Sequence, residues 1–130
     1  MAVADWQQQL PVDIVDQSLT TVNPPIINKH PQGQSIIYGE AVTLKVVADG
    51  SALAYRWLKD GTEITTDKYP NIVGIHSPSL HIKSFLPEYA GRYSCVVNND
   101  AGSKTSQSAE LTLGMIRIIA TYIDQLYTII

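Results

Sequence analysis

The most constraining feature of this sequence is a two-residue alternation of apolar and polar side chains, interrupted at short intervals by turn residues. In the stretch "EAVTLKVVAD", residues 40–49, one face would carry Val42, Leu44, Val46 and Ala48. Successive side chains of a β-strand point to opposite sides of the sheet, so this alternation indicates a strand with one buried face. The next segment, "LAYRWLKDGTEI", contains Asp60-Gly61, a pair typical of the type I′ turn between antiparallel strands because both central residues have positive φ.

Further alternating segments follow along the chain. Leu80 and Ile82 would share one side of a strand that begins after Pro78, and Tyr93, Cys95 and Val97 one side of a later strand. At least six short strands are predicted, with no helix of ten or more residues between positions 24 and 114. This spacing of strands and turns predicts an all-β sandwich of two sheets.

Length and charge narrow the class of protein. The chain has 130 residues, enough for one ordinary domain, and its 12 acidic and 9 basic side chains are scattered, with a net charge of −3. A nucleic-acid partner is therefore not expected, because no basic patch is concentrated anywhere. We expect a leader or linker over residues 1–23, one domain over residues 24–114, and an apolar tail over residues 115–130.

Three stretches carry a resemblance to a known family: "YRWLKDG", "SLHIKSFLPEYAGRYSCVVNNDAG" and "SAELTL". Together they resemble an immunoglobulin domain of the I-set, over about 90 residues from Pro24 to Gly114. The resemblance implies an immunoglobulin-like two-sheet β-sandwich with an irregular N-terminal leader and a short C-terminal tail. It makes Trp57 the core tryptophan of strand C, Tyr93 the corner tyrosine, and Cys95 the cysteine of strand F.

Two positions depart from the family pattern. Val46 stands where the strand B cysteine is expected, so the usual disulfide cannot form, and Tyr89 stands where the family usually has an aspartate. In the chain-entropy account, a missing bridge across about fifty residues forgoes on the order of 3 to 4 kcal/mol of stability. We expect Cys95 to be an inert, buried thiol that fills this space with its neighbours. The predicted structural core consists of Val46, Trp57, Leu80, Ile82, Tyr93 and Cys95.

No residue pattern indicates catalysis. His30, His76 and His81 are far apart and show no metal-ligand spacing, and Ser77 and Ser79 lack the context of a nucleophile. We therefore predict no catalytic, cofactor-binding or metal-binding residue, no cofactor, and no enzymatic activity in this chain.

The tail "MIRIIATYIDQLYTII", residues 115–130, has apolar residues at a spacing of three and four. This spacing predicts a short amphipathic helix, although the Ile, Thr and Tyr content would also suit a strand. With Arg117 and Asp124 inside 16 residues, it does not have the length or apolar character of a transmembrane segment. The predicted partner-binding residues of this tail are Ile116, Ile119, Ile123 and Leu126.

These features predict a protein–protein interaction module whose partner is another protein, with homotypic pairing left open. The single cysteine, the missing secretory signal and the missing Asn-x-Ser/Thr triplet favour a cytoplasmic scaffold or signalling protein, muscle-scaffold-like or paracaspase-like. The alternative is an extracellular adhesion or receptor domain whose signal peptide and neighbouring domains lie outside this sequence. A third hypothesis, a fragment of an enzyme, would require a catalytic domain elsewhere.

Overall fold

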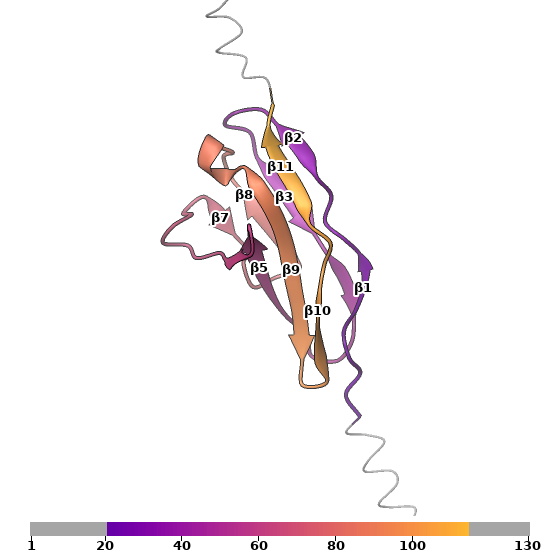
Figure 1. The fold of residues 1–130 in the computed structure, drawn as a ribbon. Coiled ribbons are helices and arrows are strands. Elements are labelled where there is room, and N and C mark those ends of the chain that lie inside the picture. The colour runs from indigo at the N-terminus through magenta and orange to yellow at the C-terminus, as the bar shows by residue number, and fades with distance from the viewer. Residues whose placement is uncertain (1–20, 115–130) are drawn as a thin grey trace, which may run out of the picture.

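The computed structural model describes residues 21–114, which form a β-sandwich with a single 3-10 turn as the helical element among them (Figure 1). The predicted all-β architecture is confirmed. Its elements, in chain order, are β1 Ile26–Lys29, β2 Gln34–Ile36, β3 Val42–Lys45, β4 Val47–Asp49, β5 Ala54–Lys59, β6 Thr62–Glu63, β7 Ile72–Val73, β8 Ser79–Ile82, the 3-10 turn Pro87–Tyr89, β9 Gly91–Asn99, β10 Gly102–Thr105 and β11 Ala109–Leu113.

The strands form two layers. In one layer β3, β8 and β7 are neighbours, and β4 pairs with β1 directly after β3 ends. Val46 lies between β3 and β4, and its backbone N–H donates to the Pro78 carbonyl at 3.0 Å. The other layer has the strand order β2-β11-β9-β5-β6, and β10 pairs with the C-terminal half of β9. Figure 1 shows β9 and β11 in front of β3 and β8.

The first strands of the chain belong to different layers. β1 pairs antiparallel with β4, and the chain then crosses to the second layer, where β2 runs parallel to β11. Pro31 is buried within this crossing, and a Cβ on Gly33 would lie 3.0 Å from the Glu110 carbonyl oxygen. A side chain at position 33 would therefore require a small shift of the β11 backbone, because β2 passes close to it.

The hairpin between β5 and β6 closes through the turn that the sequence predicts. Asp60 and Gly61 have φ values of 52° and 80°, and the strands pair from Lys59 opposite Thr62. Positive φ at both central residues defines a type I′ turn, whose twist matches that of the flanking strands.

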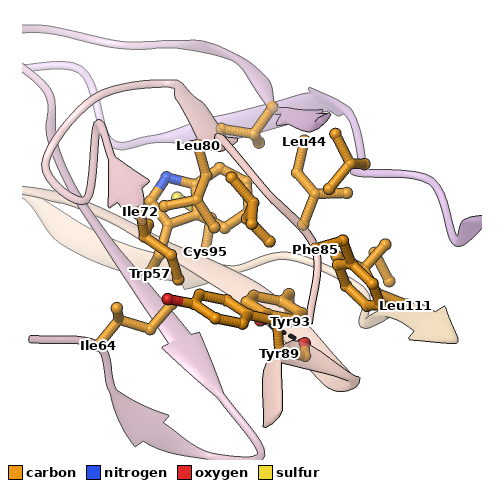
Figure 2. Close-up of a cluster of buried hydrophobic side chains, with 14 of the residues drawn as sticks. Leu44, Trp57, Ile64, Ile72, Leu80, Phe85, Tyr89, Tyr93, Cys95 and Leu111 are labelled. Atoms are coloured by element: carbon orange, nitrogen blue, oxygen red, sulfur yellow. Dashed lines mark hydrogen bonds between the residues drawn. The ribbon is translucent and has the colours of Figure 1, made fainter. Parts of the chain in front are cut away.

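Alternating side chains from both layers fill the space between them, as Figure 2 shows. On β3 the inward residues are buried and the intervening ones exposed, and on β8 the inward residues are buried and the intervening ones half-buried. The largest fully buried side chains are Trp57, Tyr93, Phe85, Leu44, Ile72, Leu80, Ile82, Leu111 and Val97. This single core joins both sheets and contains no buried side-chain nitrogen or oxygen without a hydrogen-bond partner among the described residues.

Candidate functional site

The centre of the sandwich lies where the family's disulfide would be. Trp57 on β5 and Cys95 on β9 are directly opposite each other, and both are fully buried, as is most of Val46. In Figure 2 the Cys95 sulfur lies beside the Trp57 indole. The indole N–H donates to the Ser77 carbonyl at 2.8 Å, so the one polar atom of this large side chain has a partner.

The thiol itself has the properties of an apolar core group. Cys95 is a free cysteine, and its sulfur makes a weak contact with the Val96 carbonyl at 3.9 Å. Burial raises the pKa of the Cys95 thiol to about 12, and a backbone hydrogen bond with Arg56 lowers it only in part. Because the thiolate is the reactive form of cysteine, a thiol with this pKa is a poor nucleophile at neutral pH.

The structure buries all six residues of the predicted core. Leu80, Ile82, Trp57, Tyr93 and Cys95 have an exposed fraction of 0%, and Val46 of 3%. Sequence reasoning missed Ser106, the one buried polar residue here, whose hydroxyl accepts the Cys95 N–H at 2.9 Å and donates to the Gln107 carbonyl at 2.9 Å. It lies where β10 ends before β11 begins, so its hydroxyl replaces ladder hydrogen bonds at the break. A polar residue at the end of an alternating run was the available signal.

Tyr93 and Tyr89 together form the corner below the core. The Tyr93 hydroxyl donates to the Tyr89 carbonyl at 2.6 Å, the dashed line in Figure 2. Burial raises the pKa of the Tyr93 phenol, with smaller contributions from Tyr69, Asp60 and Tyr89. Tyr89, in place of the family's aspartate, accepts the Asn71 N–H at 3.2 Å, and its ring meets the Tyr69 ring edge-on at a centroid distance of 5.4 Å.

A carboxylate does occur at this end of the sandwich, but it comes from the β5–β6 turn. Asp60 accepts the Arg92 N–H at 2.9 Å and contacts the Lys59 ammonium at 3.2 Å, while its own N–H donates to the Arg92 carbonyl at 2.7 Å. The hydrogen bond from the Arg92 backbone, followed by that from Lys59, lowers the pKa of the Asp60 carboxyl. Asp60 therefore fixes the start of β9 to the turn.

The three histidines have separate partners. Nδ1 of His30 accepts the Gln107 N–H at 3.0 Å, while Nδ1 of His81 lies 2.8 Å from the Thr43 hydroxyl. His76 contacts the Tyr55 carbonyl at 3.2 Å. Over residues 21–114 no three His, Cys, Asp or Glu side chains are gathered as metal ligands.

A groove opens at the crossing from β1 to β2, with a volume of about 670 Å³. Its walls come from three places: the end of β1, the start of β2 and the outer side of β3. It is lined by Asn28, Lys29, His30, Gln32, Gln34, Thr43, Lys45, Val47 and Gln107. The sequence offered the proline and glycine of the crossing as a signal, but nothing that placed them beside β3.

The predicted partner-binding residues Ile116, Ile119, Ile123 and Leu126 lie outside the described residues, as does the leader. Within the described part of the chain, no helix is long and apolar enough to cross a membrane.

The sequence profile of the immunoglobulin domain matches residues 24–99, so the chain belongs to the immunoglobulin domain family. Among curated relatives, it is 32% identical to mouse inactive tyrosine-protein kinase 7 over 93 residues, which cover 70% of this chain and 9% of that protein. It is 31% identical to human leucine-rich repeat-containing protein 4B over 108 residues, 82% of this chain and 15% of the relative. The chain thus spans a small part of these curated relatives.

Solved structures show the same fold. The tandem immunoglobulin repeats of Dlar superpose with a TM-score of 0.66 at 25% identity, covering 74% of this chain and 51% of that one. The titin domains Z1Z2, solved in complex with telethonin, give a TM-score of 0.64 at 25% identity, covering 73% and 50%. The predicted family is therefore confirmed, and the comparisons give the predicted cytoplasmic location no support.

Proposed function

We propose that this chain is a non-catalytic protein-recognition domain of a receptor- or adhesion-type protein. The observation that carries the proposal is the outer face of the β5 and β9 strands. Here the half-buried Leu58 and the largely covered Val96, which is 5% exposed, form a small apolar centre on the outer side, since they alternate with the inward-facing Trp57, Cys95 and Val97. Two ion pairs flank this centre: Arg56–Glu63 at 3.8 Å and Arg92–Glu110 at 3.2 Å.

This arrangement suits an interface. Protein–protein interfaces combine an apolar centre with a polar, hydrated rim, and their specificity depends on complementary charges. The four charged side chains of the rim are 48–71% exposed, so each pair contributes little to stability and is free to exchange partners.

The receptor-type parent is supported by the proteins to which the chain is similar. They include the Drosophila receptor protein tyrosine phosphatase DLAR, with a TM-score of 0.66 at 25% identity. The lone cysteine does not oppose this parent, because a fully buried thiol is shielded from an oxidising environment as well as a reducing one.

A cytoplasmic scaffold is the second candidate, and the single cysteine and the missing Asn-x-Ser/Thr triplet favour it. The two candidates differ in the cellular compartment of the parent protein. An antibody raised against the full chain should detect the parent protein after biotinylation of intact source cells with an impermeant reagent. Labelling that requires permeabilised cells would contradict the receptor-type assignment.

The recognition face has its own test. The full chain, biotinylated and assembled on fluorescent streptavidin, should bind intact source cells, and Arg56→Glu should reduce that binding at least about tenfold, the effect of removing about 1.4 kcal/mol. Lys83→Glu, an exposed charge reversal on the other sheet, is the matched control. Equal loss in both variants, or no loss in Arg56→Glu, would show that the β5–β9 face is not the recognition surface.

A further inference from the structure

Among residues 21–114, one edge of β3 has no strand partner. β3 pairs with β8 on one side, while β1 pairs with β4 and β2 pairs with β11. On the other side of β3, among the described residues, the Thr43 carbonyl accepts only a long hydrogen bond of 3.4 Å, from the side chain of Gln34. An internal strand edge therefore faces the groove at the β1–β2 crossing.

Strand geometry tells which backbone groups point into the groove. The N–H of Val46 donates towards β8, to Pro78, whereas the Thr43 carbonyl is directed away from β8, to Gln34. The N–H and C=O of one strand residue point to the same edge, and neighbouring residues alternate between the two edges. The backbone groups of Thr43 and Lys45 therefore face the groove, where both residues line the wall.

The groove is cationic. Lys29 and Lys45 lie on its walls with His30, and none of its lining residues is Asp or Glu. In the described part of the chain neither lysine has a carboxylate within ion-pair distance, whereas Arg56, Lys59 and Arg92 each have one. The nearest acid along β4, Asp49, is held by the Asn28 amide at 2.7 Å.

We propose that an extended acidic segment of a protein partner binds in this groove as an added strand along β3. Its backbone pairs with Thr43 and Lys45, displacing the Gln34 amide, and its carboxylates meet Lys29 and Lys45. Main-chain pairing with an exposed strand edge is an established mode of peptide recognition, and a groove of about 670 Å³ is in the size range of ligand sites. Val47, which is 47% exposed, offers an apolar contact at one end.

This inference deepens the protein-recognition role proposed above, naming the partner's chemistry and a second surface. The probe is a blocked hexapeptide of alternating glutamate and valine, titrated into the full, 15N-labelled chain. We expect chemical-shift changes and slowed hydrogen exchange at the Thr43 and Lys45 amides. Lys45→Glu and Lys29→Glu should each weaken binding at least about tenfold, while Lys104→Glu, an exposed reversal on β10, should leave it unchanged.

Peptide controls separate strand pairing from charge attraction. The alternate backbone nitrogens of the hexapeptide form two sets, and each set can be methylated in a separate peptide. Methylation of one set should abolish binding and methylation of the other should leave binding unchanged, because only alternate amides of an added strand face β3. A lysine–valine peptide should not bind. A sulfated disaccharide that binds with the same lysine dependence, but leaves the Thr43 and Lys45 amides unchanged, would overturn the proposal in favour of a carbohydrate.

Other results would overturn it too: no binding of the glutamate–valine peptide at millimolar concentration, or equal weakening by Lys104→Glu. The cell-binding assay keeps the two proposals apart. If the unmodified chain binds cells but the peptide does not bind the groove, the groove assignment fails and the recognition role stands. If the peptide binds the groove but the chain does not bind cells, the groove assignment stands and the recognition role fails.

Discussion

At the scale of single residues, Cys95 occupies the buried core position of the family's disulfide but remains a free thiol. Half of the usual bridge remains, buried between Trp57 and the inner side of the other sheet, with its sulfur in contact with little besides carbon. A free cysteine packs as a small apolar residue, so Val46 and Cys95 can fill the volume that a disulfide would occupy.

The buried thiol predicts a loss of stability at alkaline pH. The pKa of Cys95 is about 12 in the folded chain against an ordinary 9.0, so between these values the unfolded chain has lost a proton that the folded chain keeps. The free energy of unfolding should therefore fall as pH rises from about 9 towards 12, by up to about 1.4 kcal/mol per pH unit for this group.

Urea denaturation at several pH values, with Cys95→Ala as the comparison, measures this slope. The variant should show a shallower decline between pH 9 and 10, while Tyr93, whose phenol pKa is also raised by burial, contributes equally to both chains. Maleimide should label native Cys95 slowly and unfolded Cys95 fully. Equal slopes and rapid native labelling would show that the thiol is accessible.

Residue-level prediction from sequence reached its limit at position 89. The missing aspartate could be seen in "EYAGRYSC". The contacts that take the aspartate's place could not be predicted from the sequence. Tyr89 contacts Asn71 and Tyr69. The Asp60 carboxylate reaches Arg92 from a turn about thirty residues earlier in the sequence. Such substitutions depend on which loops meet in space, which period and propensity do not encode.

At the scale of elements, the β5–β6 hairpin allows a matched test of backbone conformation. Gly61 and Gly102 are both exposed, and a Cβ at either would meet no atom within 4 Å, but only Gly61 has a positive φ, of 80°. Gly61→Ala should lower the free energy of unfolding by about 1–2 kcal/mol, the cost of a left-handed conformation.

Gly102→Ala should be neutral or slightly stabilising, because the replacement restricts the unfolded chain without straining the folded one. Thermal unfolding followed by circular dichroism compares the two variants directly. Similar losses in both would mean that side-chain volume, and not φ, limits these positions.

The crossing from β1 to β2 is the element that sequence could not place. The change of layer depends on β2 pairing with β11 about 77 residues later in the sequence, as the pairing of Gln34 with Leu111 shows. The groove beside β3 exists only because of that long-range pairing. Alternation predicted β3 and β8 well, since each has one buried face.

At the scale of the whole molecule, packing and hydrogen bonds hold the two sheets together without a disulfide. Val46→Cys should restore the family's bridge by forming a disulfide with Cys95 under oxidising conditions. The closed loop has about fifty residues, so the chain-entropy account gives a gain on the order of 3 to 4 kcal/mol in the free energy of unfolding.

Urea denaturation of Val46→Cys with and without reductant measures the gain, and mass spectrometry establishes the bond. The double variant Val46→Cys with Cys95→Ala is the control, because it keeps the new side chain and cannot form the bridge. If the disulfide forms without raising the free energy of unfolding, the bond must strain the packing around position 46.

The path of the chain also determines how the domain would carry mechanical load. Residues 21 and 114 lie at opposite ends of the sandwich (Figure 1), and β2 and β11 run parallel, with Gly114 donating a further hydrogen bond to Ile36 at 2.8 Å. Tension applied between these ends pulls the two strands along each other, so their hydrogen bonds share the force and must break together. Resistance to stretching between residues 21 and 114 should therefore be concentrated in the three paired residues on each strand.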